Sequence, residues 1–327
     1  MDTALNRSIT GRFAPSPTGP LHIGSLVAAV GSYAMAKRLD GRWLVRIEDL
    51  DLPRVVPGIA DTMLRTLEAF GFQWDGAVVY QSRRLDAYKA ALDKLIAQRI
   101  AYPCGCSRAE ISLVASAPHG EEGVVYPGTC RDGLPPEKIE RAVRVKVYNE
   151  VISFDDCVMG RYSQSLSPSC GDFVVQRADG PFAYHLAVVV DDEASGVNQV
   201  VRGADLLSST PRQMYLQKIL GYATPDYCHL PLVTNPDGSK LSKRDSAVSQ
   251  AFGLDNPAKG GELLLAALRF LGQTPPSVLS TASCREIIDW AVTRFDPALI
   301  PQTSAPLNLT IPKSLLSRNA IPPPLDR

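Results

Sequence analysis

The sequence predicts an α/β fold: a doubly wound parallel sheet of Rossmann-like type, interrupted by an inserted domain and followed by a short helical region. Three observations predict it. Strand-like and amphipathic helical segments alternate over residues 1–101, a stretch rich in cysteine, glycine and proline occupies 102–171, and the alternation resumes over 172–245. Residues 246–327 contain two helical patterns and a proline-rich tail, which we expect to be irregular. The first and third segments should therefore form two halves of one domain.

The first half supplies strands and helices in alternating order. ITGRFA is typical of a short strand, and the apolar run that follows predicts a helix from Ser25 to Leu39, closed by an Asp-Gly pair. RWLVRIED alternates its side chains between two faces, as a strand does. GIADTMLRTLEAFGF and RRLDAYKAALDKLIAQRI predict amphipathic helices, the first ended by Gly71.

The second half repeats this pattern. GDFVVQRADGPFAYHLAVVVDD and VNQVVRGADLL contain further strand and helix signals. In STPRQMYLQKILG we expect Thr210 to cap a helix, with Pro211 in its first turn and Gln213 completing a capping box. HLPLVTNPDGSKLSKRD predicts a strand, a tight turn and a basic loop. GELLLAALRFLGQ and CREIIDWAVTRF predict the two C-terminal helices.

Composition argues against several classes of protein. Lysine plus arginine and aspartate plus glutamate number 34 each, so the formal net charge is zero and any contact with nucleic acid must come from a local patch. No run approaches the roughly 18 unbroken apolar residues of a membrane span. The N-terminal residues also lack the apolar core of a signal peptide, so we expect a cytoplasmic protein. Seven cysteines, an odd number, argue against a disulfide framework.

The stretch APSPTGPLHIGS joins the first strand to the first helix. Its three prolines make a stiff loop that leads His22 and Gly24 onto the first helical turn. That turn offers free N–H groups and the positive end of the helix dipole, which suit a phosphate. His22 can donate to a phosphate oxygen, and Gly24 permits close approach of a ring or backbone. The alternative is a rigid loop with a surface histidine.

The second basic loop favours the phosphate interpretation. SKLSKRD places Lys240 and Lys243 three residues apart, with Ser242 between them and Arg244 after them. A run of charge is usually a solvated face. Here it follows a strand and a tight turn, where an α/β sheet presents its ligand loops. On such a loop the two lysines can surround a charged phosphorane.

Together these residues resemble the two signatures of class I aminoacyl-tRNA synthetases, here HIGS and KLSKR. The longer match GRFAPSPTGPLHIGS, with VRIEDLD, FAYHLAVVVDD and VVRGADLL, is similar to the glutamyl/glutaminyl branch from about Thr10 to Asp245. The resemblance implies a nucleotide-binding catalytic domain that uses ATP with Mg²⁺. It also implies that ATP contacts His22, Gly24 and Lys243, and that His22, Lys240 and Lys243 are catalytic.

Glutamate carries two carboxylates and one ammonium, so its pocket should offer two cationic or donor groups and one carboxylate. Arg12 and Arg202 can bind the carboxylates, Glu48 the ammonium, and Tyr184 can add a hydroxyl. An isolated charged residue is more often part of a surface ion pair. The glutamate-binding positions implied by the resemblance are Arg12, Phe13, Ala14, Pro15, Ser16, Glu48, Tyr184 and Arg202.

Length then distinguishes members of the branch. Only 83 residues follow Arg244, which leaves little room for an anticodon-binding region of well over ~100 residues. The chain therefore resembles the truncated paralogues, the glutamyl-queuosine tRNA(Asp) synthetases. The resemblance implies ATP, L-glutamate and the anticodon stem-loop of tRNA(Asp) as partners of a monomer. Glutamate would be activated without tRNA and esterified onto the cyclopentenediol of queuosine at the wobble position. The alternatives are a conventional glutamyl-tRNA synthetase charging the 3′ end and a catalytically silent nucleotide- or RNA-binding paralogue.

Three cysteines of the insertion, Cys104, Cys106 and Cys130, have a spacing that favours tetrahedral zinc, one ion per chain. The residues alone leave the fourth ligand open, with His119 the natural choice, whereas the resemblance implies Tyr126. We expect Tyr126, with His119 as the alternative. The alternative is three buried thiols without metal. A zinc ion here would be structural, because the insertion is too small to build its own core. We expect the remaining cysteines to be ordinary small apolar residues: Cys157, Cys170, Cys228 and Cys284.

Overall fold

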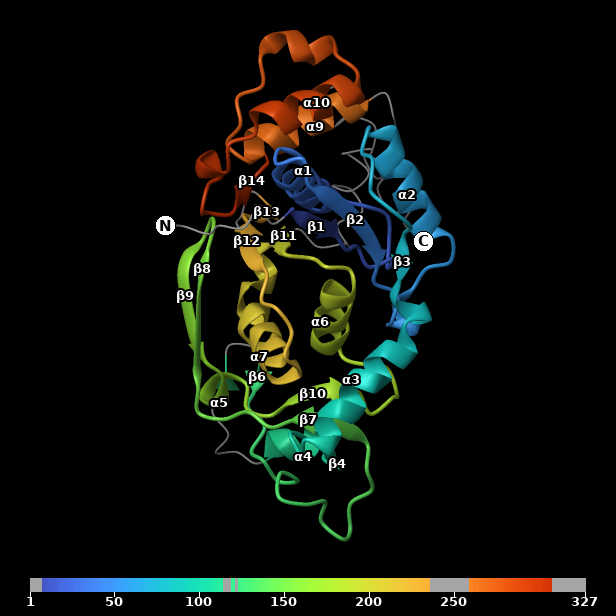
Figure 1. Cartoon of the computed structure of the whole chain (residues 1–327), viewed down its shortest axis with the longest axis vertical. Coiled ribbons are helices and arrows are strands. Elements are labelled where there is room, and N and C mark those ends of the chain that lie inside the picture. The colour runs from blue at the N-terminus through green and yellow to red at the C-terminus, as the bar shows by residue number, and fades with distance from the viewer. Residues whose placement is uncertain (1–7, 114–118, 121–122, 236–258, 308–327) are drawn as a thin grey trace, which may run out of the picture.

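The computed structural model describes residues 8–113, 119–120, 123–235 and 259–307. Along its longest axis, two C-terminal helices lie at one end, a parallel sheet occupies the middle, and the three-stranded sheet of the insertion lies towards the other end (Figure 1). In the described part of the chain, no helix is both long and apolar enough to cross a membrane.

The central sheet is parallel, as the alternation of strand and helix predicts. Its first three strands are β1 (Thr10–Phe13), β2 (Arg42–Ile47) and β3 (Val79–Tyr80). Strands β11 (Gln199–Gly203) and β12 (Asp226–Leu230) pair in parallel with each other, and β11 lies against β1. The N–H of Asn198 donates to the carbonyl of Thr10, 3.0 Å away, across this junction. The spatial order is therefore β3-β2-β1-β11-β12. Successive strands of the first half are added on one side of β1 and those of the second half on the other side, so the strand order reverses between β1 and β11.

Helix α1 (Ile23–Lys37) packs against the sheet and against α9 (Gly260–Phe270) and α10 (Cys284–Arg294), which form the outer layer (Figure 1). Apolar side chains of these elements and of α2 (Ile59–Ala69) make the main core. Gly31 brings α1 close to β12, because a Cβ at this position would lie 2.6 Å from Cδ1 of Leu230. The helix expected from residue 25 begins two residues earlier.

A second core joins helices α3 (Leu85–Ala97), α6 (Tyr184–Ala194) and α7 (Thr210–Leu220) to the insertion. The insertion holds an antiparallel sheet ordered β10-β7-β4. Its strands are β4 (Ala101–Cys104), β7 (Ala142–Val145) and β10 (Phe173–Gln176). Because β10 lies beyond residue 171, the insertion takes part of its sheet from the segment expected to begin the second half.

Several further elements are short. They include α4 (Arg108–Leu113), β5 (His119–Gly120), β6 (Gly123–Val124), α5 (Leu166–Ser169), β13 (Val233–Thr234) and β14 (Ala305–Pro306). Strands β13 and β14 pair in parallel, so the segment after α10 returns to the end of β12.

The start of α7 differs from the sequence prediction. Helix α7 continues directly from a 3₁₀ helix (Ala204–Ser209), and its N-cap, Ser209, makes no side-chain cap hydrogen bond. The expected cap at Thr210 and the capping box with Gln213 are wrong. The buried Thr210 side chain instead accepts a hydrogen bond from Nη2 of Arg202 at 2.8 Å. The preceding 3₁₀ turns carry the chain into the helix, so no side-chain cap is required.

The hairpin of β8 (Val151–Asp156) and β9 (Gly160–Ser165) connects the insertion to the central sheet. It runs along one side of the molecule towards β12 (Figure 1). The N–H of Cys157 at its turn donates to the carbonyl of Tyr227, and Val158 is buried in the main core. The structure joins Cys157 to Cys228 as a disulfide with 4.9 Å between the Cα atoms. This corrects the expectation that these two cysteines are separate apolar residues.

Candidate active site

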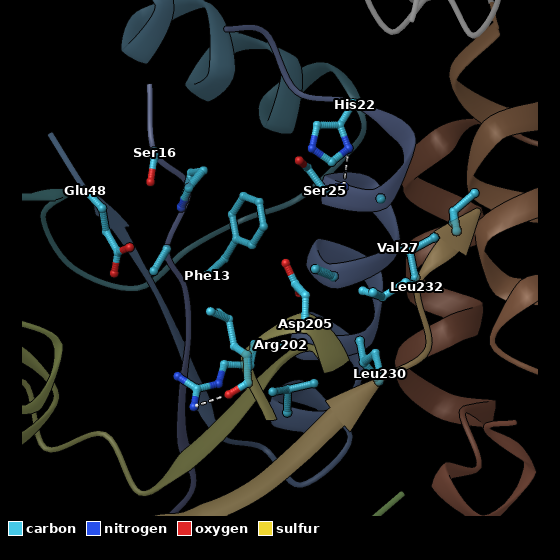
Figure 2. A pocket seen from close by; sticks show the side chains of 18 of the residues that line it. Phe13, Ser16, His22, Ser25, Val27, Glu48, Arg202, Asp205, Leu230 and Leu232 are labelled. Atoms are coloured by element: carbon cyan, nitrogen blue, oxygen red, sulfur yellow. Dashed lines mark hydrogen bonds between the residues drawn. The ribbon is translucent and has the colours of Figure 1, made fainter. Parts of the chain in front are cut away.

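A pocket of about 670 Å³ lies where β1, β2, β11 and β12 end and α1 begins. This is the edge at which open parallel sheets bind ligands, and the volume suits a small-molecule site. All the glutamate positions expected from the sequence line it: Arg12, Phe13, Ala14, Pro15, Ser16, Glu48, Tyr184 and Arg202. His22 and Gly24 line it too. Figure 2 shows Glu48 and Ser16 across the pocket from Val27, Leu230 and Leu232.

The stiff loop after β1 is fixed to the end of β2. The N–H of Glu48 donates to the carbonyl of Pro15 at 3.0 Å, and the N–H of Val56 donates to Pro17 at 3.0 Å. His22 is the N-cap of α1, where its Nδ1 accepts from the N–H of Ser25 at 3.3 Å (Figure 2). In the neutral ring this leaves the proton on Nε2, the nitrogen that can donate to a ligand.

Gly24 supports this arrangement by its lack of a side chain. A Cβ at this position would lie 3.1 Å from Cε1 and Nδ1 of His22. A side chain here would press on the imidazole ring, which would have to shift by a few tenths of an ångström. Glycine therefore leaves the histidine cap undisturbed and the approach to the helix N-terminus open.

Two buried arginines on neighbouring strands share one carboxylate. Nη1 of Arg46 lies 2.6 Å from Oδ1 of Asp192, and Nε of Arg12 lies 3.5 Å from the same oxygen. Burial opposes ionisation of Asp192, but Arg46 and Arg12 outweigh it and lower the pKa of its carboxyl. Nη1 of Arg12 donates to the carbonyl of Val201 at 3.2 Å. These contacts fix the Arg12 guanidinium between β1, α6 and β11.

Glu48 is the carboxylate of the pocket. Its Oε1 accepts from Nη2 of Arg46 at 3.2 Å. Burial raises the pKa of Glu48 above its ordinary value, although Arg46 and Arg12 favour the ionised form. When ionised, Glu48 offers a negative group beside the cations, as the ammonium of an amino acid requires.

Arg202 is held on two sides by neutral acceptors. Its Nε donates to Nε2 of His229 at 3.1 Å, and its Nη2 donates to Oγ1 of Thr210 at 2.8 Å. Within the described ranges Nη1 is buried and has no hydrogen-bond partner. A buried guanidinium N–H without an acceptor is energetically unfavourable, so this atom is suited to an anionic ligand. Nearby, burial raises the pKa of Tyr184, which keeps its hydroxyl protonated as a donor.

The three insertion cysteines also come together. The sulfur atoms of Cys104, Cys106 and Cys130 all lie within 4.8 Å of one another. The hydroxyl of Tyr126 is 3.3 Å from Sγ of Cys104 and 3.8 Å from Sγ of Cys106, and it accepts from the N–H of Cys130. Three thiols and one phenol thus converge, which fits a four-coordinate zinc ion in number and in donor chemistry.

The other candidate ligand is not tested by this geometry. His119 lies on β5, and its side chain is outside the described part of the structure. Arg144 packs directly against the cluster. Its Nε is 3.3 Å from Sγ of Cys104, and its guanidinium lies 3.8 Å from the ring centre of Tyr126.

The sequence matches a known family over most of its length. The model of the family "tRNA synthetases class I (E and Q), catalytic domain" matches residues 8–296. The chain belongs to this family. The Glutamyl-Q tRNA(Asp) synthetase of Geobacter sulfurreducens is 63% identical over 301 residues, 92% of this chain and 96% of that protein. The enzyme of the same name from Dechloromonas aromatica is 52% identical, covering 92% and 98%.

A solved structure agrees with this assignment. The glutamate tRNA ligase of Elizabethkingia meningosepticum, determined in complex with its amino acid, has a TM-score of 0.76 and 26% identity. The similarity covers 94% of this chain and 69% of that one. The mixed α/β architecture is therefore that of a class I synthetase of the glutamyl/glutaminyl type.

The second signature of this class I family falls in a part of the chain that the structure does not describe. Lys240, Ser242, Lys243 and Arg244 lie within residues 236–258. Their expected approach to a phosphate stays a prediction. The described chain resumes at Lys259, directly before α9.

Sequence reasoning missed several groups in and behind the synthetase pocket. Asp205 lines the pocket, and Arg46, Asp192 and His229 contact the lining residues Glu48, Arg12 and Arg202 from behind. Arg46 and Asp192 stand in the matched runs VRIEDLD and FAYHLAVVVDD. The usable signal was a charged residue inside an apolar strand or helix, which is rarely buried unless it is paired. Apolar lining residues of the second half carried no such signal, because they look like ordinary core: Val201, Leu206, Leu230, Leu232 and Val233.

Proposed function

We propose that the protein activates L-glutamate with ATP, without tRNA, and transfers the glutamyl group to queuosine at the wobble position of tRNA(Asp). The observation that carries glutamate activation is one pocket in which two buried guanidinium groups, Arg12 and Arg202, stand beside the carboxylate of Glu48. The choice of acceptor is supported by relatives named Glutamyl-Q tRNA(Asp) synthetase, which this chain matches over almost their full length.

Glutamate fits the charges of the pocket. The unpartnered Nη1 of Arg202 and the guanidinium of Arg12 bind the two carboxylates, and Glu48 binds the ammonium. Tyr184 adds a hydroxyl donor at the start of α6. Phe13, Ala14, Pro15 and Ser16 form the wall between this end and α1. The apolar surface of Val27, Leu230 and Leu232 lies on the other side and suits the flat base of ATP.

Activation is an in-line displacement at phosphorus. The α-carboxylate of glutamate attacks the α-phosphorus of ATP, a carboxylate–phosphorus bond forms, and pyrophosphate leaves with the electrons of the broken P–O bond. The carboxylate is already a nucleophile, so no protein base is required. Catalysis consists of positioning and charge stabilisation by His22, the N-terminus of α1, Lys240 and Lys243. Mg²⁺ arrives with ATP and neutralises phosphate charge.

Transfer follows from the mixed anhydride. A hydroxyl of the cyclopentenediol attacks the glutamyl carbonyl carbon, an ester bond forms, and AMP leaves as the anhydride bond breaks. The proton of the attacking hydroxyl passes to the departing phosphate group of AMP or to water. The acceptor lies in an anticodon stem-loop, a small RNA footprint consistent with a chain of zero net charge.

Zinc, where bound, would be held by Cys104, Cys106, Cys130 and Tyr126 as a structural ion. It would join β4 to the loop before β7 and so stabilise the insertion, proposed as an acceptor-like domain over residues 102–171. The chemistry in the pocket requires no group from this cluster, since none of its residues lines the pocket.

The decisive experiment locates labelled glutamate on the tRNA. The protein is incubated with ATP, labelled glutamate and tRNA(Asp) with or without queuosine, and the tRNA is cleaved to locate the label. We expect label near the anticodon only when queuosine is present, and ATP–pyrophosphate exchange without any tRNA. Label at the 3′ end with tRNA-dependent exchange would indicate a conventional glutamyl-tRNA synthetase. No exchange under any condition would indicate a silent nucleotide- or RNA-binding paralogue.

A further inference from the structure

A buried chain of hydrogen bonds leads from the pocket into the β8–β9 hairpin. Arg202 on β11 donates through Nε to Nε2 of His229 on β12, 3.1 Å away. Nδ1 of His229 lies 2.6 Å from Oδ2 of Asp156 at the end of β8. The three residues are 6%, 0% and 5% exposed, so water does not compete for these contacts. Only Arg202 lines the pocket.

Asp156 is an ionised acceptor. Its Oδ1 accepts from the N–H groups of Val158 and Met159, at 3.0 and 2.9 Å, and the backbone N–H of His229 lies 3.0 and 3.1 Å from its two oxygens. Burial opposes its ionisation, but the hydrogen bonds from His229 outweigh it and lower the pKa of Asp156. Because Oδ2 of an ionised carboxylate can only accept a hydrogen bond, Nδ1 of His229 must carry the proton in this contact.

This proton fixes the direction of the whole chain of bonds. Burial lowers the pKa of His229, so the ring is neutral and carries its one proton on Nδ1. Nε2 is then an acceptor, which is what Nε of Arg202 needs. In the opposite tautomer two N–H groups would face each other at 3.1 Å. In the Arg202 guanidinium, Nε donates to His229 and Nη2 donates to Thr210. Nη1 is the nitrogen left without a partner in the described chain.

We propose that Asp156 and His229 are positioning residues for glutamate: Asp156 sets the His229 tautomer, and His229 orients the Arg202 guanidinium so that Nη1 binds a substrate carboxylate. The inference rests on the proposed function and deepens it. It gives the hairpin of the insertion a role in the amino-acid pocket. The adjacent Cys157–Cys228 pair joins the turn of the same hairpin to β12 beside this contact. The competing explanation is a histidine satisfied within the core, with no effect on substrate.

Asp156→Asn is the discriminating variant. The N–H groups of Val158 and Met159 both donate to Oδ1, so the amide oxygen must occupy that position and the NH₂ group must replace Oδ2. That NH₂ faces Nδ1 of His229, which can then only accept, and the ring proton moves to Nε2. Nε2–H opposes Nε–H of Arg202. A change in tautomer of this kind is known to disable a histidine without altering its position.

His229→Gln is the conservative partner, because its amide oxygen can still accept from Arg202. The matched control is Asp172→Asn. Asp172 is also a buried carboxylate, which accepts from Arg131, from the hydroxyl of Tyr102 and from the N–H of Val147, but it does not line the pocket. The Asp172→Asn variant therefore shows the effect of losing a buried carboxylate charge when the contacts of Arg202 are unchanged.

The measurement is ATP–pyrophosphate exchange with the full chain, with KM for glutamate and for ATP determined separately and with active sites titrated. For Asp156→Asn we expect the KM for glutamate to rise about 10- to 100-fold, as for loss of a hydrogen bond to a charged group. The KM for ATP should stay within about twofold. The KM for glutamate of His229→Gln should lie closer to the wild-type value than that of Asp156→Asn. Asp172→Asn should lower thermal stability and leave both KM values unchanged.

Two results would overturn the proposal, and they differ from failure of the proposed function. If Asp156→Asn changes both KM values equally, or only the active fraction, Asp156 is merely structural. If His229→Gln is as impaired as Asp156→Asn, the acceptor at Nε2 is not the cause. If instead wild-type protein shows no glutamate-dependent exchange, the proposed function fails and this role fails with it.

Discussion

The pocket and the cysteine cluster both bury polar groups, but they satisfy them differently. In the pocket, Arg202 keeps a buried N–H without a partner in the described chain, and Arg12 and Glu48 border a cavity of about 670 Å³. In the cluster, the hydroxyl of Tyr126 contacts its own neighbours, and Arg144 covers the ring. The pocket therefore has polar groups available to bind a ligand, whereas the three thiols and the phenol of the cluster all face one another. Substitutions in the pocket should change kinetics, and those in the cluster should change stability.

The largest kinetic effect should come from the basic loop. Lys243→Ala removes a cation from the charged transition state, and we expect the rate of ATP–pyrophosphate exchange to fall about 10²–10³-fold, as for loss of one oxyanion-hole donor. Glutamate binding, measured by calorimetry without ATP, should persist. Unchanged exchange would remove Lys243 from the mechanism.

Arg202→Leu tests the open donor itself. Loss of a buried, charged hydrogen-bonding partner of the substrate should lower kcat/KM for glutamate about 10²-fold. The thermal midpoint serves as the stability readout. The control is Arg161→Leu, which removes an exposed arginine paired with Asp155 on the hairpin and should have little effect. Equal losses in both variants would contradict a specific role for Arg202.

The cluster should give the opposite result. Cys130→Ser, or zinc removal by a chelator, should lower the thermal midpoint and expose the insertion to proteolysis, because metal-binding energy contributes to folding energy. The part of the sample that stays folded should keep its KM for glutamate. Metal analysis should find one zinc per wild-type chain and less in the variant. A selective rise in the KM for glutamate with unchanged stability would break the contrast between the two regions.

The smallest expected effect concerns pH and Glu48. Because burial raises the pKa of Glu48, the side chain stays protonated in the folded protein at pH values where an ordinary glutamate is ionised. The KM for glutamate should therefore fall as pH rises through this raised pKa, by about tenfold for one charged hydrogen bond. Glu48→Gln should abolish this acid limb and keep the high KM at all pH values. A pH profile identical in both proteins would exclude Glu48 as the ammonium ligand.

The sequence determined the features that neighbouring residues encode together. The strand–loop–helix run around His22, the parallel strands and the three insertion cysteines are each carried by contiguous or closely spaced residues. Periodicity, prolines and short motifs were therefore enough to place them. The expected glutamate positions line one pocket for the same reason, since each stands at the end of a strand or in the loop or helix beside it.

Only the tertiary structure decided which buried charges meet. Arg46 and Asp192 are 146 residues apart, and Asp156 and His229 are 73 apart. The Cys157–Cys228 pair, 71 residues apart, and the attachment of β10 to the sheet of the insertion depend equally on which strands lie side by side. The expected helix cap at Thr210 is wrong because 3₁₀ turns lead directly into α7, and the hydroxyl of Thr210 instead contacts Arg202. Local pattern sets what each segment can form, but pairing of buried polar groups is settled when distant segments pack and exclude water.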